Sequence, residues 1–357
     1  MVKKKISALK QKTPLRRGFF LGEFPKDLLG IKELSRPQIE KILDVAERFK
    51  ALLALRGIAN AGRSPSGASD KTTNFRWGSG GERDLTQLEG KTVINLFFEP
   101  STRTRTSFEI AARRLSADVV TITPQTTSLT KGESLKDMVQ NLEAMEPDLL
   151  VVRHASSGVP GLIAAHTRAA VINAGDGSHE HPSQAFVDLF TVREKLGAES
   201  LDGLHLLIVG DIAYSRVARS NIYAFKKMGA RVTCVGPATL LPPGLESLGA
   251  RVSTDLDREL PETDVLMLLR IQKERQEKMN FPSLSEYTRF FGLTKERFVR
   301  MKKGAIIMHP GPINRGVEID PDIADSLVPD GPRTVILDQV GNGVPVRMAI
   351  LSQWRRA

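Results

Sequence analysis

Short β-rich runs alternate with amphipathic segments from Lys91 to the end of the chain, and this alternation constrains the fold more than any other feature. Such alternation is typical of parallel sheets that are covered by helices on both faces. The expected strands form two series, at 92–98, 118–122, 148–152 and 170–173, and then at 205–209, 231–235, 265–269, 305–308 and 334–337. Helical periodicity predicts helices near 102–115, 134–145, 182–196, 216–228, 284–302 and 342–355, after a first helix that begins at Ser35-Arg36-Pro37.

The two series of strands, in a chain of 357 residues, favour two domains. We expect an α/β fold of two doubly wound parallel-sheet domains joined by helices, with a disordered basic tail at the N-terminus. The expected boundaries are 1–22 for the tail, 23–180 for the first domain and 181–340 for the second, with a C-terminal helix at 341–357 that packs back on the first domain. Residues 57–84 are rich in glycine and serine, which predicts a flexible insertion there.

The net charge of +10 suggests an anionic partner, but its distribution weakens the case for nucleic acid. Residues 1–22 hold seven lysines and arginines and no acid, so the rest of the chain carries only +3. This tail has neither interleaved aromatic residues nor a periodic basic face, so we interpret it as a solvated extension, with polyanion binding as the alternative. We therefore expect no nucleic-acid partner.

Hydropathy and cysteine usage exclude further classes of protein. No run approaches the ~18 apolar residues of a membrane-spanning helix, and Phe19–Leu21 is too short for the apolar core of a secretory signal. A single cysteine, Cys234, excludes an internal disulfide and a multi-cysteine zinc cluster. We expect a cytoplasmic protein without a membrane partner.

The segment after the first predicted strand is typical of an anion site, because parallel α/β sheets bind ligands beyond the carboxyl ends of their strands. Residues 99–105 read Glu-Pro-Ser-Thr-Arg-Thr-Arg, and a helix is expected to begin at Ser101 or Thr102. Arg103 and Arg105 would then lie in the first turn, where the helix dipole disfavours cations. Hydroxyls, guanidiniums and free backbone N–H groups together favour a phosphate or carboxylate over a random basic helix start.

Other predicted strand ends carry further polar side chains, namely Arg153, His181, Gln184, Arg216, Arg270 and Gln272, and a loop before another helix carries Lys131. One phosphate needs only two or three cations, so the remaining arginines predict a second acidic ligand such as a dicarboxylate. His179 and His181 lack accompanying ligands for a metal. Gly210 is not followed by the further glycines of a dinucleotide-binding turn. We therefore expect no metal and no cofactor, and chemistry by positioning and electrostatic stabilisation.

Four motifs, in the same order, resemble those of the aspartate and ornithine carbamoyltransferases. Residues 98–109 are similar to the carbamoyl-phosphate signature of that family, and His181-Pro182-Ser183-Gln184 matches its second motif. The segments 270–272 (Arg-Ile-Gln) and 309–312 (His-Pro-Gly-Pro) resemble the aspartate branch. The ornithine branch is expected to have a cysteine in two of these motifs, and Cys234 lies in neither. The resemblance extends from about residue 25 to the C-terminus, apart from 57–84.

The resemblance implies transfer of the carbamoyl group from carbamoyl phosphate to L-aspartate in pyrimidine (UMP) biosynthesis. The first domain would bind carbamoyl phosphate and the second aspartate. The implied carbamoyl-phosphate ligands are Ser101, Thr102, Arg103, Thr104, Arg153, His181, Gln184, Gly311 and Pro312. The implied aspartate ligands are Lys131, Arg216, Arg270 and Gln272, and the implied catalytic residues are Arg103, Thr104, Arg153 and His181.

The resemblance also implies a homotrimer whose active sites lie between subunits, with the lysine loop supplied by the neighbour. In that loop the family usually has two serines, whereas here Thr127 precedes Ser128, which leaves open which hydroxyl reaches phosphate. The sequence does not decide whether regulatory or dihydroorotase chains associate with this one. A zinc site of the regulatory type cannot lie within this chain. The alternatives are an ornithine carbamoyltransferase and a non-catalytic homologue retained for assembly.

Overall fold

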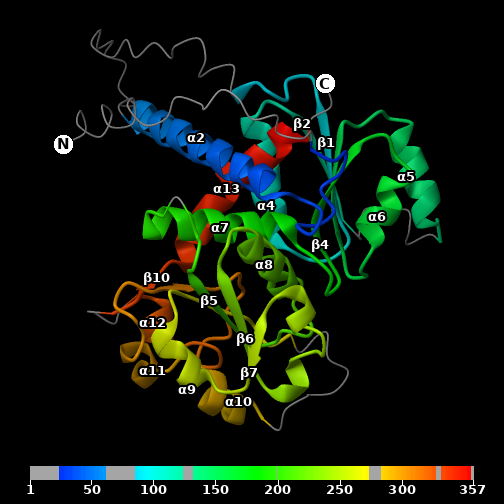
Figure 1. Cartoon of the computed structure of the whole chain (residues 1–357). Coiled ribbons are helices and arrows are strands. Elements are labelled where there is room, and N and C mark those ends of the chain that lie inside the picture. The colour runs from blue at the N-terminus through cyan, green and yellow to red at the C-terminus, as the bar shows by residue number, and fades with distance from the viewer. Residues whose placement is uncertain are drawn as a thin grey trace.

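Two parallel sheets, one in each half of the chain, organise the structure (Figure 1). The computed structural model describes residues 24–61, 85–123, 132–198, 200–272, 283–326 and 331–354. Within these ranges the expected fold class of two doubly wound parallel-sheet α/β domains is confirmed. The predicted basic tail, most of the predicted insertion, and Thr127, Ser128 and Lys131 lie outside them.

The first sheet has the strand order β2-β1-β3-β4 in the described residues. Its strands are β1 (Thr92–Phe97), β2 (Asp118–Ile122), β3 (Leu149–His154) and β4 (Ala170–Asp176). The helices of this half are α2 (Arg36–Ala61), α4 (Thr102–Arg114), α5 (Leu135–Glu143), α6 (Val159–Ala164) and α7 (Pro182–Leu196). The chain passes from β1 outward to β2 and then back across to β3, so the strand order reverses between β1 and β3.

The second sheet has the order β10-β9-β8-β5-β6-β7. Its strands are β5 (His205–Val209), β6 (Arg231–Val235), β7 (Arg251–Ser253), β8 (Val265–Leu268), β9 (Ile306–Met308) and β10 (Arg333–Thr334). The helices are α8 (Arg216–Lys227), α9 (Leu256–Glu259), α10 (Leu284–Phe291), α11 (Lys295–Val299), α12 (Pro321–Ala324) and α13 (Ile336–Gln353). Among the described residues of this half, 3₁₀ turns lie at Ala238–Leu240, Glu246–Leu248 and Leu260–Glu262. Here the order reverses between β5 and β8.

One continuous apolar layer joins the two sheets. Successive strand residues point to opposite faces, so one face of each sheet contributes to this layer. Val93 of β1 and Ile172 of β4 belong to the same core as Ile208 of β5 and Met308 of β9. Helix α13, drawn in red in Figure 1, packs against α2, α4 and α7 and supplies this layer from the C-terminus. The outer faces have separate cores: α5 and α6 cover the first sheet, and α10 and α11 contribute to the outer core of the second.

Local sequence signals account for most helix ends. Ser134 and Ser215 are N-caps that accept hydrogen bonds from the N–H groups of Asp137 and Ala218, both at 3.1 Å. Gly197 ends α7 in the left-handed conformation (φ 61°), which glycine adopts without a steric penalty. No helix in the described parts of the chain has the length and apolar character needed to cross a bilayer.

Some elements differ from those expected. Helix α2 continues to Ala61, into the segment that was predicted to be an insertion from residue 57. The helix expected at 284–302 is two helices with a break at Gly292, whose extended backbone (φ −73°, ψ 141°) ends α10. The expected strand 334–337 is wrong beyond Thr334, because Ile336 begins α13. That helix was expected only from residue 342.

The topology places the polar strand ends together. Ligands in open α/β sheets bind at the carboxyl edge where the strand order reverses. In the first sheet this point is flanked by the start of α4 after β1 and by Arg153 on β3. In the second it is flanked by Arg216, which begins α8 after β5, and by the segment that follows β8 and contains Arg270.

Candidate active site

The start of α4 presents the expected cluster of hydroxyls and a guanidinium. Ser101 is the N-cap with an extended backbone, and its side chain makes no capping hydrogen bond. Thr102 and Arg103 are exposed in the first turn, whereas Thr104 is buried. Arg103 Nη1 donates to the carbonyl oxygen of Pro310 at 3.0 Å, so this helix start faces the loop after β9 of the other sheet.

Glu99 joins two of the expected arginines. Its Oε1 accepts hydrogen bonds from Arg153 Nη2 at 3.0 Å and from Arg216 Nη2 at 2.5 Å. The Arg216 side chain is only 4% exposed and that of Arg153 only 12%. Since Arg153 belongs to the first sheet and Arg216 to the second, one carboxylate neutralises cations from both halves of the chain.

A glycine makes the approach of these two guanidiniums possible. Gly175 near the end of β4 has φ +114°, and a Cβ there would lie 3.1 Å from both Arg153 Nη1 and Arg216 Nε. Any larger residue would be strained in that backbone conformation and would crowd both arginines. Arg153 Nη1 also donates to the carbonyl oxygen of Ala174 at 3.2 Å, and Arg216 Nη1 to that of His154 at 3.4 Å.

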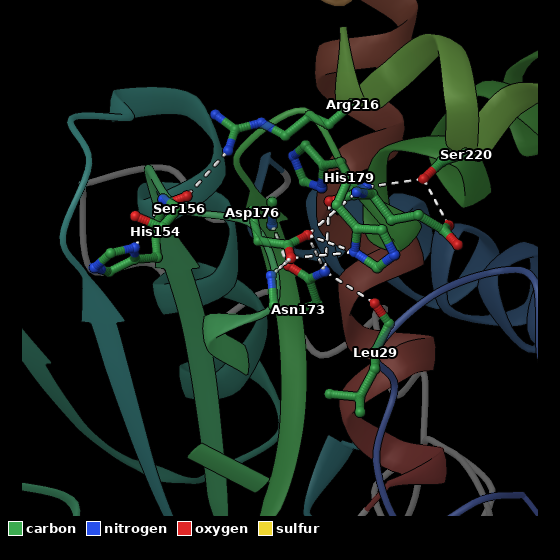
Figure 2. A network of polar contacts seen from close by, with 12 residues as sticks. Leu29, His154, Ser156, Asn173, Asp176, His179, Arg216 and Ser220 are labelled. Atoms are coloured by element: carbon green, nitrogen blue, oxygen red, sulfur yellow. Dashed lines mark hydrogen bonds and ion pairs between the residues drawn. The ribbon is translucent and has the colours of Figure 1, made fainter. Parts of the chain in front are cut away.

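His181 is fixed at the start of α7 by a polar network at the end of β4, shown in Figure 2. Its backbone N–H donates to Ser220 Oγ at 2.8 Å, and Ser220 Oγ donates to Glu180 Oε2 at 2.8 Å. Glu180 Oε2 also accepts from the N–H of Ile31 at 2.8 Å, and burial raises the pKa of this carboxyl. The network fixes the backbone that carries His181, and Ser183 Oγ lies 3.4 Å from His181 Nδ1.

The two residues expected after β8 lie beside the end of β5. The backbone N–H of Gln272 donates to Asp211 Oδ2 at 3.1 Å, and its Nε2 donates to the carbonyl oxygen of Tyr214 at 3.0 Å. Asp211 is fully buried and also accepts from the N–H of Tyr214 at 3.2 Å. Arg270 is partly buried two residues earlier. The segment that carries both candidate residues is therefore attached to the turn before α8.

The turn after β9 is built for close approach to Arg103. Gly311 has φ +66°, and a Cβ on it would collide with the Arg103 guanidinium. The peptide bond between Gly311 and Pro312 is cis. His309 Nδ1 accepts a hydrogen bond from the N–H of Gly311 at 2.8 Å. Burial, with Arg103 and Arg270 nearby, lowers the pKa of His309 to about 3, so its ring is neutral at physiological pH.

Gln184 is oriented by a buried side chain that the sequence did not single out. Its Nε2 donates to Asp188 Oδ1 at 2.8 Å, and the same oxygen accepts from Gln339 Nε2 at 2.8 Å. The Gln339 Oε1 atom accepts from the N–H of His309 at 2.9 Å. Gln184 on α7 and the 309–312 turn after β9 are thus joined by two side chains, Asp188 and Gln339.

The described residues contain no group of three or more histidine, cysteine, aspartate or glutamate side chains that is arranged to hold a metal ion. His179 Nδ1 instead lies 3.1 Å from Asp176 Oδ2, and this contact raises the pKa of His179. The site has cations and hydrogen-bond donors in place of a metal ligand set, so it is suited to binding anions and stabilising negative charge.

Comparison with known proteins shows which family the chain belongs to. The model described as "Aspartate/ornithine carbamoyltransferase, carbamoyl-P binding domain" matches residues 26–194, and "Aspartate/ornithine carbamoyltransferase, Asp/Orn binding domain" matches residues 202–354. The aspartate carbamoyltransferase catalytic subunit of Syntrophobacter fumaroxidans is 53% identical over 326 residues, which are 91% of this chain and 96% of that protein. The chain belongs to the aspartate/ornithine carbamoyltransferase family. The catalytic subunit of Myxococcus xanthus is 52% identical, covering 91% of this chain and 98% of that one.

Solved structures of family members share the fold. The catalytic subunit of M. jannaschii aspartate transcarbamoylase has a TM-score of 0.72 and 34% identity, covering 92% of this chain and 98% of that one. Aspartate transcarbamoylase from Trypanosoma cruzi in complex with N-(phosphonacetyl)-L-aspartic acid has a TM-score of 0.76 and 27% identity, covering 92% and 95%. The same enzyme is also known in complex with carbamoyl phosphate and aspartate.

Within this family framework, the structure adds three residues that sequence reasoning missed, namely Glu99, Asp188 and Gln339. A signal for Glu99 was present, because five arginines near strand ends repel one another unless something neutralises them. We had expected the ligands to do so, whereas Glu99 is an internal counter-charge for two of them. Asp188 and Gln339 had no such signal, since they lie 151 residues apart in the sequence.

Proposed function

We propose that this chain is the catalytic chain of an aspartate carbamoyltransferase in the route to UMP. It would transfer the carbamoyl group of carbamoyl phosphate to the α-amine of L-aspartate, giving N-carbamoyl-L-aspartate and phosphate. Relatives that are 53% and 52% identical to this chain are named aspartate carbamoyltransferase catalytic subunits, which supports this activity. So does the similarity to an enzyme that has been crystallised with carbamoyl phosphate and aspartate.

One observation carries the proposal. The strand-order reversals of both sheets are lined with cations, and the two edges contact each other through Glu99 and Arg216 and through Arg103 and Pro310. A site with this charge suits two anionic substrates that must meet. We assign carbamoyl phosphate to the edge of the first sheet and aspartate to that of the second.

We propose the following ligands. Ser101, Thr102, Arg103 and Thr104 at the start of α4 would bind the phosphate, since free N–H groups and a helix dipole favour an anion there. Arg153, His181 and Gln184, with the backbone at Gly311 and Pro312, would orient the carbamoyl group. Arg216, Arg270 and Lys131 would bind the two carboxylates of aspartate, with Gln272 in support.

In the proposed reaction, the α-amine of aspartate attacks the carbamoyl carbon and forms a tetrahedral intermediate. Thr104, Arg153 and His181 would donate hydrogen bonds to the oxyanion, while Arg103 stabilises the charge of the phosphate. The C–O bond to phosphate then breaks, and the leaving phosphate accepts the proton from the amine. No side-chain base is then needed, in keeping with His309, whose pKa of about 3 makes its ring a weak base.

We further propose that the protein is a homotrimer whose active sites are shared between subunits, and that it is cytoplasmic. The relatives are named as subunits, which supports an assembly. Edge strand β2 leads into the segment that contains Lys131, and Val120 on this strand is 48% exposed, which provides apolar surface for an interface. Light scattering on the purified protein tests this, and a monomer with full activity would contradict it. Association with regulatory or dihydroorotase chains would appear in the same measurement on mixtures.

The activity is tested by supplying carbamoyl phosphate with either L-aspartate or L-ornithine and measuring the carbamoylated product. We expect turnover with aspartate alone. Turnover with ornithine alone would assign the chain to the other branch of the family. No turnover with either, by protein that unfolds cooperatively, would indicate a non-catalytic homologue.

A further inference from the structure

A buried carboxylate lies between the two sheets, one side chain away from the candidate carbamoyl site. Asp188 is fully buried, and its Oδ1 accepts from Gln184 Nε2 and Gln339 Nε2, both at 2.8 Å. Its Oδ2 accepts from Asn221 Nδ2 at 2.8 Å. Arg347, also buried, provides positive charge nearby. Burial raises the pKa of Asp188 to about 6, so the carboxylate is ionised at pH 7.5 and only accepts hydrogen bonds; each amide must therefore turn an N–H group toward it.

This constraint fixes the amide of Gln184. The amide nitrogen and oxygen lie on opposite sides of the same carbon atom, so Oε1 faces away from Asp188 when Nε2 faces it. Gln184 is in the first turn of α7 and Asp188 is one turn later, so Oε1 is directed toward the start of the helix, where His181 lies. Gln184 therefore keeps its acceptor oxygen free on the side of the site, while one of its two N–H groups is bound by Asp188.

The same carboxylate fixes a second amide, on the other side of the site. Gln339 Nε2 donates to Asp188, which leaves its Oε1 to accept from the N–H of His309 at 2.9 Å. If this amide were reversed, an N–H group would face the His309 N–H and the contact would be lost. His309 in turn accepts from the N–H of Gly311, so the polarity of Gln339 supports the turn that contacts Arg103.

The chemistry of the donor substrate makes amide polarity important. The carbamoyl group ends in an NH₂ group that can only donate, whereas an acyl phosphate such as acetyl phosphate has a methyl group of similar size there. An acceptor oxygen held toward this position favours the former and gains nothing from the latter. Sites that hydrogen-bond one substrate group discriminate strongly against analogues without it.

We propose that Asp188 is a positioning residue that sets the amide polarity of Gln184 and Gln339 and thereby makes the site selective for a carbamoyl over an acetyl donor. This inference rests on the proposed function. Asp188 acts through its neighbours and does not itself contact the substrate.

The test is the Asp188→Leu variant, which keeps the approximate size of the side chain but removes both acceptor atoms, including the Oδ1 atom that binds the two glutamine amides. Two quantities are measured with L-aspartate as acceptor: kcat/KM for carbamoyl phosphate, and the inhibition constant of acetyl phosphate as its competitor. Both donors share the phosphate contacts of Arg103, but only carbamoyl phosphate uses the Gln184 oxygen. We therefore expect kcat/KM to fall by about tenfold more than the affinity for acetyl phosphate does, the effect of one misplaced hydrogen bond. A merely structural role would weaken both together.

Two further variants keep the test decisive. Asn221→Ala removes a neighbour of Asp188 that contacts neither Gln184 nor Gln339, so we expect it to lower stability and leave the ratio of the two constants unchanged. Asp188→Leu leaves Arg347 without its counter-charge, so the double variant with Arg347→Met is the form to assay if the single variant does not unfold cooperatively.

The outcomes separate this inference from the proposed function. Wild-type protein that fails to carbamoylate aspartate would overturn the proposed function. Active wild-type protein with an Asp188→Leu variant that loses affinity for carbamoyl phosphate and acetyl phosphate equally, or for neither, would overturn the role of Asp188 alone.

Discussion

A Glu99→Gln substitution removes a negative charge and should weaken the contact between the two halves of the site. The carboxylate accepts from Arg153 and Arg216, and charge-assisted hydrogen bonds contribute about 1.5–3 kcal/mol each. Both bonds end on Oε1, so a glutamine oxygen there can retain both of them, each at roughly half that strength. Both guanidiniums are largely buried, at 12% and 4% exposure, but Glu99 is 21% exposed, which moderates the loss. We expect the free energy of unfolding to fall by about 1.5–3 kcal/mol, toward the lower end of that range.

The assay is urea unfolding followed by circular dichroism, with and without inorganic phosphate. Phosphate should stabilise the Glu99→Gln variant more than the wild type, because two uncompensated guanidiniums attract the anion. The KM for aspartate should also rise, because Arg216 loses the carboxylate that holds its guanidinium in position. Glu109→Gln is the matched control: Glu109 lies on α4 and faces Arg105 at 3.9 Å near the surface, so we expect less than about 0.5 kcal/mol. Equal stabilities for Glu99→Gln and wild type would refute the reasoning.

Three other substitutions test the turn and the second sheet. Gly311→Ala should weaken carbamoyl-phosphate binding at least tenfold by displacing the Arg103 guanidinium, measured by calorimetry; unchanged affinity would place that guanidinium elsewhere. Arg270→Ala should raise the KM for aspartate and lower kcat with carbamoyl-phosphate binding nearly intact, and unaltered aspartate kinetics would show the role to be misassigned. The pKa of His309 is lowered to about 3, below its ordinary 6.5, so the unfolded chain binds more protons between these values and stability falls as pH drops through that window. The loss is about 2 kcal/mol at pH 5, and it should be absent in His309→Asn, whose oxygen can still accept from the N–H of Gly311. An equal acid sensitivity of both proteins in urea unfolding at pH 7.5 and 5 would contradict this.

Periodicity predicted most of the strands and helices because their apolar faces are set locally. The errors lie where long-range packing decides. Residues 334–337 read Thr-Val-Ile-Leu, a typical strand, yet Ile336 begins α13. Two later residues of this helix, Gln339 and Asn342, are buried with hydrogen-bond partners on α7. Pro345 lies inside this helix, in the part that was predicted from residue 342, so only the first turns were missed.

The candidate site shows the same limit. That the cations would gather could be predicted, because parallel strands bring their carboxyl ends to one edge. The side chains that neutralise or orient these cations could not be predicted. Glu99 and Arg216 are 117 residues apart, and Gln184 is oriented through a side chain that does not itself reach the site. Such pairings depend on how two sheets face each other, which no local pattern encodes. The predicted role of Lys131 stays a prediction, since it lies outside the described residues.

The apolar layer that the two sheets share has a consequence for how the chain can be divided. Helix α13 comes from the end of the sequence but packs against α2, α4 and α7 of the first half. A fragment that stops at Leu196 would therefore expose the apolar faces of these helices to water, and the remainder would lack their partners. The two halves bind different substrates in the proposed reaction, yet they form one folding unit and should melt in a single transition. Neither half is a module that gene fusion or fission could transfer alone.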